Sequence, residues 1–213
     1  MARLLRFYFQ ILDILKIRII KEMREKTKAR KKCKVFSYLL RPIIIIAVLI
    51  GMAMLLISQL ELNKSFNRNI AIYKLQEDTK KKIAQDIIPL ETETDIIKYC
   101  SDVVADMLSF DRKNMIPNGK ANCVGYAQLT SAIINYAFQV KKLPYKAKPV
   151  VGKVYLFGID LNNVAQQILP QKHRPFFKDH DFVEVDLGDK TIYVDSSLQD
   201  LTGYKFYQTK IAN

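Results

Sequence analysis

The feature that most constrains this chain is a run of nineteen residues without a charged side chain, from Pro42 to Leu60. As a helix that rises about 1.5 Å per residue, the run extends about 28 Å, close to the thickness of the hydrocarbon core of a bilayer. A buried core helix of a globular protein is the alternative. We favour a membrane span because no face of this run carries a charged residue. The pattern therefore predicts a transmembrane helix over 42–60.

The positive charge is concentrated before this run. Residues 1–41 hold 13 Lys or Arg residues and three acidic residues, a net charge of +10, whereas the rest of the chain has a net charge of +3. Basic flanks stay on the cytoplasmic side, so we expect a cytoplasmic N-terminus and an extracytoplasmic C-terminal domain. A cleaved signal peptide is the competing interpretation, but its apolar segment would be about 7–15 residues long and would end at a small-residue cleavage site. The sequence favours a single-pass membrane protein.

The basic arm over 1–41 has two parts. From Met1 to Ile20, apolar and basic residues follow the pattern of an amphipathic helix that lies on a membrane surface. Residues 21–34 are almost entirely charged, and anionic lipid headgroups are their simplest partner. Nucleic acid is the alternative partner of a basic run, but aromatic residues are not interleaved with these charges. We therefore expect membrane lipids, and no nucleic acid, as partners of the arm.

After the apolar run, the order of the patterns predicts an α+β fold. Residues 61–91 are polar and are predicted to form a membrane-proximal stalk that is partly helical. The expected elements after the stalk are helices over 92–110 and 123–140, then strands over 147–159, 181–187 and 191–194. Helices followed by an antiparallel sheet indicate one α+β domain over 92–213.

The last two strands predict a hairpin with a defined register. With Gly188 and Asp189 as its loop, the aliphatic positions of the two strands fall opposite one another: Leu187 with Lys190, Val185 with Ile192, and Val183 with Val194. The same register pairs Phe182 with Asp195 on the other face and places His180 diagonal to Asp195. Diagonal neighbours lie about 7–8 Å apart at the backbone, which is within reach of a His–Asp hydrogen bond. A slip of one residue would separate the two side chains.

Cys123 adds a nucleophile to this pair. It begins a predicted helix directly after Asn122, a good N-cap residue. Free backbone N–H groups and the helix dipole at that point favour a thiolate and can donate to an oxyanion. With His180 as base and Asp195 as orienting carboxylate, the set suits acyl transfer through a thioester. Taken singly, the three residues would be interpreted as a small buried thiol, a surface histidine and a turn aspartate.

The other cysteines and the second histidine have no comparable context. Cys100 falls on the apolar face of a predicted helix and is interpreted as a buried thiol, although pairing with Cys123 stays open. His173 is interpreted as a surface residue of a loop. Two histidines seven residues apart do not have the spacing of zinc ligands, and no glycine-rich phosphate loop is present. We therefore expect neither a metal nor a cofactor.

Three short segments resemble motifs of transglutaminase-like proteins. They are the cysteine motif ANCVGYA over Ala121–Ala127, the histidine strand HDFVEV over His180–Val185, and the aspartate strand YVDSS over Tyr193–Ser197. The resemblance covers about residues 92–203 and implies a papain-like fold in which the cysteine helix packs on an antiparallel sheet. It also implies that Cys123 is the nucleophile, His180 the base and Asp195 the orienting group.

Two positions depart from the family pattern. Phe182 stands where the family often has tryptophan, and Ser196 stands where a proline is frequent after the aspartate. These departures leave the three candidate residues in place and leave the pocket for the acyl acceptor unassigned. Asn122 is a candidate for the oxyanion site.

Together these patterns predict a membrane-anchored cysteine acyl-transfer enzyme that acts on peptide or side-chain amides of a peptide or protein substrate. Release of the acyl group by water would make it a peptidase or amidase, and release by an amine a transglutaminase. Hydrolysis is favoured because nothing in the sequence suggests a lysine-binding channel. The alternative from another class is a non-catalytic domain of the same fold that serves as an interaction or scaffold module of a membrane protein assembly. A weaker alternative is a subunit whose main role lies in its membrane arm.

Overall fold

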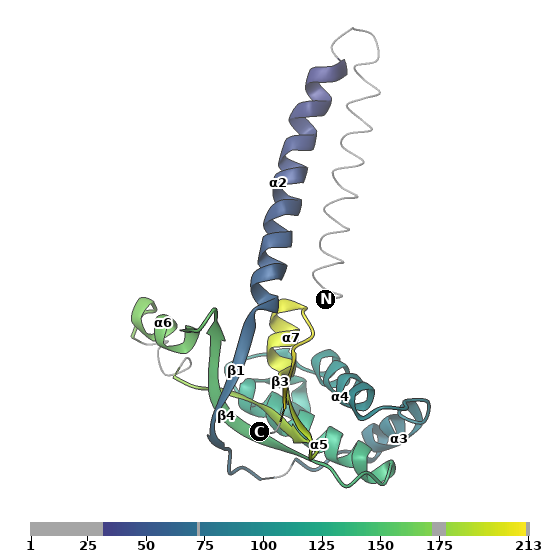
Figure 1. Cartoon of the computed structure of the whole chain (residues 1–213). Coiled ribbons are helices and arrows are strands. Elements are labelled where there is room, and N and C mark those ends of the chain that lie inside the picture. Colours follow the sequence, from purple (N-terminus) through teal and green to yellow (C-terminus); the bar gives the residue numbers. More distant parts are fainter. Residues whose placement is uncertain (1–31, 72, 172–177, 212–213) are drawn as a thin grey trace. The chain divides into compact units, whose positions relative to one another are not determined.

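The structure is a computed structural model that describes residues 32–71, 73–171 and 178–211. The chain divides into two compact units, Met1–Ser58 and Gln59–Asn213, and each is described by itself (Figure 1). The amphipathic helix predicted for residues 1–20, most of the charged stretch that follows it, and His173 lie outside the described residues.

The first unit contributes one long helix, α2 (Lys32–Ser58), which has Pro42 in its interior. The helix predicted over 42–60 is therefore part of a longer helix that ends two residues earlier. Its large apolar side chains from Ile44 to Leu56 are exposed. Within the part of the chain that the structure describes, no helix combines the length and the apolar character needed to cross a membrane.

The second unit is built on a six-stranded sheet, and each neighbouring pair in it is antiparallel. Its strands lie in the order β1 (Leu60–Asn67), β4 (Lys146–Leu156), β6 (His180–Asp186), β7 (Lys190–Val194) and β8 (Tyr207–Ile211), with β5 (Ile159–Asp160) paired to β4. A separate parallel pair consists of β2 (Ser109–Phe110) and β3 (Lys120–Ala121). The predicted α+β fold with an antiparallel sheet is confirmed.

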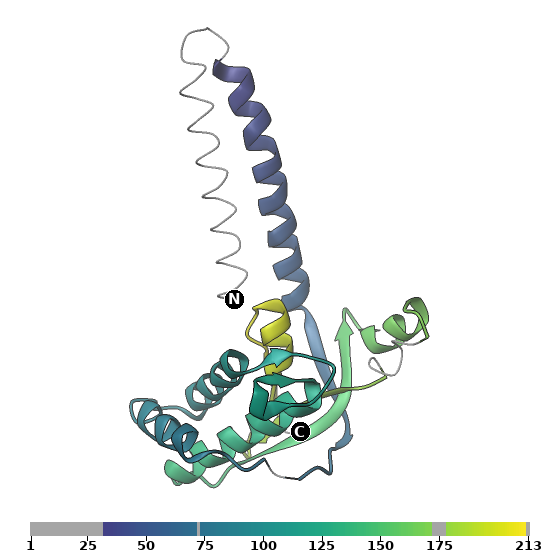
Figure 2. The same cartoon turned by 180° about the vertical axis from the view of Figure 1, so that it is seen from behind.

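Helices of the second unit cover one face of this sheet (Figures 1 and 2). The described helices of the second unit are α3 (Glu77–Asp86), α4 (Glu93–Met107), α5 (Cys123–Val140), α6 (Leu161–Ile168), α7 (Ser196–Thr202) and the short 3₁₀ helix η1 (Ile116–Asn118). The core-forming helices are α3, α4 and α5, whereas α6 lies beyond the end of β4. The predicted helix over 123–140 has the bounds of α5. Neither α6 nor α7 was predicted.

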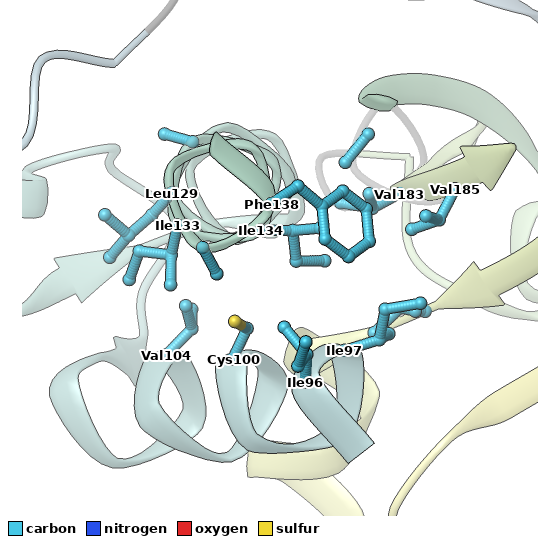
Figure 3. Close-up of a cluster of buried hydrophobic side chains, with 14 of the residues drawn as sticks. Ile96, Ile97, Cys100, Val104, Leu129, Ile133, Ile134, Phe138, Val183 and Val185 are labelled. Atoms are coloured by element: carbon cyan, nitrogen blue, oxygen red, sulfur yellow. The ribbon is translucent and has the colours of Figure 1, made fainter. Parts of the chain in front are cut away.

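The central helix α5 packs against α4 and against strands β4 and β6, and side chains of α4, α5 and β6 meet in the core (Figure 3). Eleven of its eighteen residues are buried, so it is apolar around most of its circumference, as expected of a helix enclosed on several sides. Figure 3 shows Ile97 and Cys100 of α4 on the side that faces Ile134 of α5, and Val183 of β6 beside the ring of Phe138. Cys100 is fully buried and unpaired, so the interpretation of this residue as a buried thiol is confirmed.

Residues 61–91 do not form a stalk, because they belong to the second unit. Strand β1 pairs along β4, and its Leu62 is fully buried. Ile83 of α3 and Ile87 after it are also fully buried, in the core that contains α4 and α5. Leu62, Ile83 and Ile87 belong to a mostly polar segment, and their burial depends on partners that lie far away in the sequence.

The predicted hairpin and its register are confirmed. Val183 pairs with Val194 and Val185 pairs with Ile192, and the backbone N–H of Leu187 donates to the carbonyl of Lys190 at 2.9 Å. Gly188 in the loop has a φ of +87°, which other residues adopt with strain. The aliphatic side chains of this face are all buried in the same cluster as α5. The hairpin is thereby fixed against the helix that begins with Cys123.

Candidate functional site

The three candidate residues each stand at the end of an element. Cys123 is the first residue of α5, and the side chain of Asn122 caps this helix by accepting from the backbone N–H of Gly125 at 3.2 Å. His180 is the first residue of β6. Asp195 directly follows β7 and is the N-cap of α7. Because residues at element ends are held by regular structure on one side only, their side chains can face a common site.

His180 and Asp195 are in direct contact, as the hairpin register predicted. His180 Nε2 is hydrogen-bonded to Asp195 Oδ2. The side chain of Asp195 is 1% exposed, and that of His180 is 14% exposed. With Nε2 engaged by the carboxylate, Nδ1 is the imidazole nitrogen that is left to exchange a proton with another group.

The carboxylate of Asp195 is fixed by further donors. Its Oδ1 accepts from the backbone N–H of Ser197 at 3.0 Å, from the Ser197 hydroxyl at 2.7 Å and from the backbone N–H of Leu198 at 3.0 Å. These donors belong to the first turn of α7, where backbone N–H groups have no partner inside the helix. Helix α7 therefore orients the carboxylate that orients the imidazole.

The electrostatics favour a charged pair at neutral pH. Burial lowers the pKa of His180. The charge and hydrogen bond of Asp195, together with a hydrogen bond to Cys123, have a larger effect in the opposite direction, so this pKa lies well above its usual value. Burial raises the pKa of Asp195, yet His180 and the α7 donors outweigh this effect and leave that pKa below its ordinary value. Both shifts stabilise the imidazolium that forms when Nδ1 of His180 accepts a proton.

Cys123 has a second polar neighbour that the sequence analysis missed. Its sulfur lies 3.8 Å from Asp181 Oδ2 and donates to that oxygen. Asp181 is 1% exposed and follows His180 on the opposite face of β6. This face carries Val183 and Val185, both buried in the core. A carboxylate in line with buried aliphatic residues is unusual, and that pattern was the signal that could have identified it.

Arg68 neutralises this buried carboxylate. Its Nε lies 2.6 Å from Asp181 Oδ1, and its Nη2 lies 2.6 Å from Asp181 Oδ2. The hydrogen bond and the charge of Asp181 raise the pKa of Arg68 against the effect of burial, and Asp179 and Cys123 contribute to the same rise. Such a two-pronged pair compensates the desolvation of a buried charge. Arg68 follows β1, in the segment predicted as a stalk, and no sequence pattern linked it to the site.

A buried polar network holds α7 in place. The hydroxyl of Ser196 lies 2.9 Å from that of Ser101 on α4 and 2.9 Å from that of Thr130 on α5. Ser101 also donates to Gln199 of α7 at 3.1 Å. The hydroxyl of Ser196 thus joins three helices.

Phe182 packs beside the imidazole. Its ring is stacked on His180 with the centroids 6.5 Å apart, and it meets Tyr193 edge-on at 5.2 Å. Gly152 of β4 lies opposite His180 in the sheet. A Cβ at this glycine would be 2.8 Å from the Phe182 ring and 2.1 Å from the carbonyl oxygen of Asn63. Close packing against the histidine strand therefore requires glycine at this position.

Other candidate sites lie apart from these residues or are absent from the described ranges. A cavity of about 160 Å³ is lined by residues that include Leu75 before α3, Ile116 of η1 and Leu129 of α5, and by none of the three candidates. Among the residues that the structure describes, no group of His, Cys, Asp and Glu side chains could hold a metal ion.

Comparisons with protein-family models, with curated proteins and with solved structures give no match to this chain.

Proposed function

We propose that the unit over 59–213 is a cysteine acyl-transfer enzyme of the transglutaminase-like type, with Cys123 as nucleophile, His180 as base and Asp195 as orienting carboxylate. The observation that carries the proposal is the hydrogen-bonded His180–Asp195 pair beside the first residue of α5. A nucleophile, a base and a group that orients the base are the parts that thioester chemistry needs. A cysteine helix packed on an antiparallel sheet also agrees with a papain-like arrangement.

In the proposed reaction, the Cys123 proton first passes to Nδ1 of His180 and forms the imidazolium that Asp195 stabilises, and the thiolate sulfur then attacks the carbonyl carbon of an amide. The tetrahedral intermediate collapses as His180 gives this proton to the departing amine, which leaves a thioester on the sulfur. Water then attacks the thioester, loses a proton to His180 and releases the acid, and Cys123 recovers its proton. Asp195 keeps Nε2–H in place and stabilises the imidazolium throughout.

Hydrolysis of peptide or side-chain amides is the form of the reaction that we favour, and release by an amine is the alternative. The first turn of α5 supplies backbone N–H groups for the oxyanion. Asn122 uses its side-chain oxygen as the helix cap, so a contribution to the oxyanion site would come from its amide nitrogen, which lies 3.5 Å from the carbonyl of Arg112.

A non-catalytic scaffold module is the second candidate function, and one observation favours it. The Cys123 thiol donates to Asp181 at 3.8 Å, so Asp181 competes with the imidazole of His180 for the thiol proton. A thiol held in this way would be inert if Asp181 never released it. In this case the three candidate residues would contribute only to the folding of a domain that binds a membrane protein partner.

A membrane location with a cytoplasmic N-terminus and an extracytoplasmic enzyme is also a proposal. The positive charge of the arm supports it. The exposed apolar side chains of α2 from Ile44 to Leu56 support it as well, because a continuous apolar surface of this kind needs lipid or another protein as cover.

The proposal is tested with the purified full chain, fluorogenic peptide amides and cell-wall peptides as substrates, and a peptidyl vinyl sulfone that traps active cysteines. We expect turnover and labelling in the wild-type chain and in Cys100→Ala, the thiol control. Cys123→Ala should abolish both signals. His180→Ala should abolish turnover, and the double variant should be no worse, because groups that act as one unit show non-additive losses. Labelling that is unchanged in Cys123→Ala, or a folded wild-type chain that resists the trap, would support the scaffold function.

A further inference from the structure

The buried carboxylate of Asp181 lies against the proposed nucleophile and has no place in the reaction described above. Asp181 Oδ2 is the shared atom, because it accepts both from Arg68 Nη2 at 2.6 Å and from the Cys123 sulfur at 3.8 Å. Arg68 is 26% exposed and Asp181 only 1%, so the ion pair extends from the edge of the second unit to the sulfur. A change in the charge of Arg68 or Asp181 therefore changes the electrostatic potential at the Cys123 sulfur.

The two members act on the sulfur with opposite signs. A carboxylate 3.8 Å away opposes formation of a thiolate, and a guanidinium nearby favours it. The interaction between Arg68 and Cys123 is strong enough to contribute to the raised pKa of Arg68. With both members present, the guanidinium opposes the effect of the carboxylate on the sulfur.

We propose that Asp181 is the resting partner of the Cys123 thiol and that Arg68 is a positioning residue that keeps this partner from blocking ionisation of the nucleophile. The inference rests on the proposed function, in which Cys123 is the nucleophile. In the resting site the thiol donates to Asp181. In the active site the same proton passes to Nδ1 of His180, and the Arg68–Asp181 pair stays bound beside the thiolate.

Other charged groups around the sulfur do not produce this pattern. His180 is on the same strand and is already paired with Asp195, and Asp179 acts on Arg68. The simplest competing explanation is structural: the ion pair ties the end of β1 to β6, and its loss merely loosens the sheet. The two explanations predict different results for the single variants. Removal of either residue weakens a structural tie and so has the same effect, whereas loss of the positive or the negative charge has opposite effects on the thiol.

The test measures the rate of alkylation of Cys123 by iodoacetamide, an uncharged probe, in the full chain from pH 5 to pH 10, with the modified peptide quantified by mass spectrometry. The rate follows the fraction of thiolate. At pH 7, we expect Arg68→Gln to slow alkylation at least about tenfold, since it leaves an unneutralised carboxylate. Asp181→Asn should accelerate alkylation about threefold or more, since it leaves the guanidinium alone. The double variant should return to within about threefold of wild type.

Lys64→Gln is the matched control. Lys64 also reaches from β1 to a buried carboxylate of β6, with its Nζ 2.7 Å from Glu184 Oε2, but Glu184 is on the opposite face of the strand. We expect unchanged alkylation in this variant. If Arg68→Gln does not fold, Asp181→Asn and the double variant still decide the question, because they differ only in the charge of Arg68.

Slower alkylation in both single variants, in proportion to their loss of thermal stability, would overturn the inference in favour of a structural tie. Equal rates in Asp181→Asn and the double variant would also overturn it. Neither measurement depends on turnover. Opposite shifts in alkylation without any amide hydrolysis would therefore refute the proposed function and leave the charge control of Cys123 established.

Discussion

The contact between His180 and Asp195 can be separated from the helix cap that Asp195 also provides. Asp195→Asn keeps an oxygen that can accept from the first turn of α7. Its NH2 group then lies opposite Nε2 of His180, and the negative charge is removed. Asp195→Ala removes the charge and the cap together. A comparison of the two variants thus measures each contribution in the same protein.

The expected magnitudes follow from burial and bonding. Breaking a buried ion pair costs about 3–5 kcal/mol. We expect about 3 kcal/mol for Asp195→Asn at pH 5.5, because the unpaired imidazole can release its proton and so avoid part of the penalty. Asp195→Ala should lose about 1 kcal/mol more, since the Oδ1 acceptor for Ser197 and Leu198 is also removed.

The loss should depend on pH in a defined direction. The raised pKa of His180 means that its contribution is complete below about pH 6.5, the value in the unfolded chain, and is lost as the pH rises through the folded value. The lowered pKa of Asp195 means that its contribution is complete above about pH 3.9. The difference between wild type and Asp195→Asn should therefore be greatest between about pH 4 and 6.5 and should shrink toward pH 10.

Urea denaturation followed by circular dichroism, repeated from pH 5 to pH 10, provides the assay. The matched control is Asp186→Asn, which removes an exposed carboxylate from the last residue of β6, the strand that begins with His180, and should shift the free energy of unfolding by less than about 0.5 kcal/mol. A loss in Asp195→Asn that is the same at pH 5.5 and pH 10 would refute the reasoning, because the stabilisation would then come from shape and not from charge.

Two further predictions concern packing and location. Gly152→Ala should lower the free energy of unfolding by at least about 2 kcal/mol in the same denaturation assay, because its new methyl group would overlap the carbonyl of Asn63; an unchanged midpoint would show that β1 can move away from β4. Protease added to intact cells or spheroplasts should remove the part of the chain after Ser58 and spare the arm; protection of the C-terminal unit would contradict the proposed orientation.

The sequence by itself determined the parts of the site that depend on local periodicity. The alternation of Val183 and Val185, with a loop centred on Gly188, allows one register that buries the aliphatic face, and this register brings His180 to Asp195. The start of α5 was equally accessible, because Asn122 provides a cap and an apolar helical pattern follows. Such features involve residues close in sequence, where strand pairing and capping follow from the residue types alone.

Only the tertiary structure decided what surrounds the sulfur. Arg68 and Asp181 are 113 positions apart, and nothing in the polar segment around Arg68 indicates that β1 pairs along β4 and delivers a guanidinium to the start of β6. The cap that Asp195 provides for α7 was missed for a related reason, since a helix of seven residues has little stability of its own and is held by its contacts with α4 and α5. Periodicity shows which face of an element is buried, whereas the partner on that face is set by packing across the whole domain.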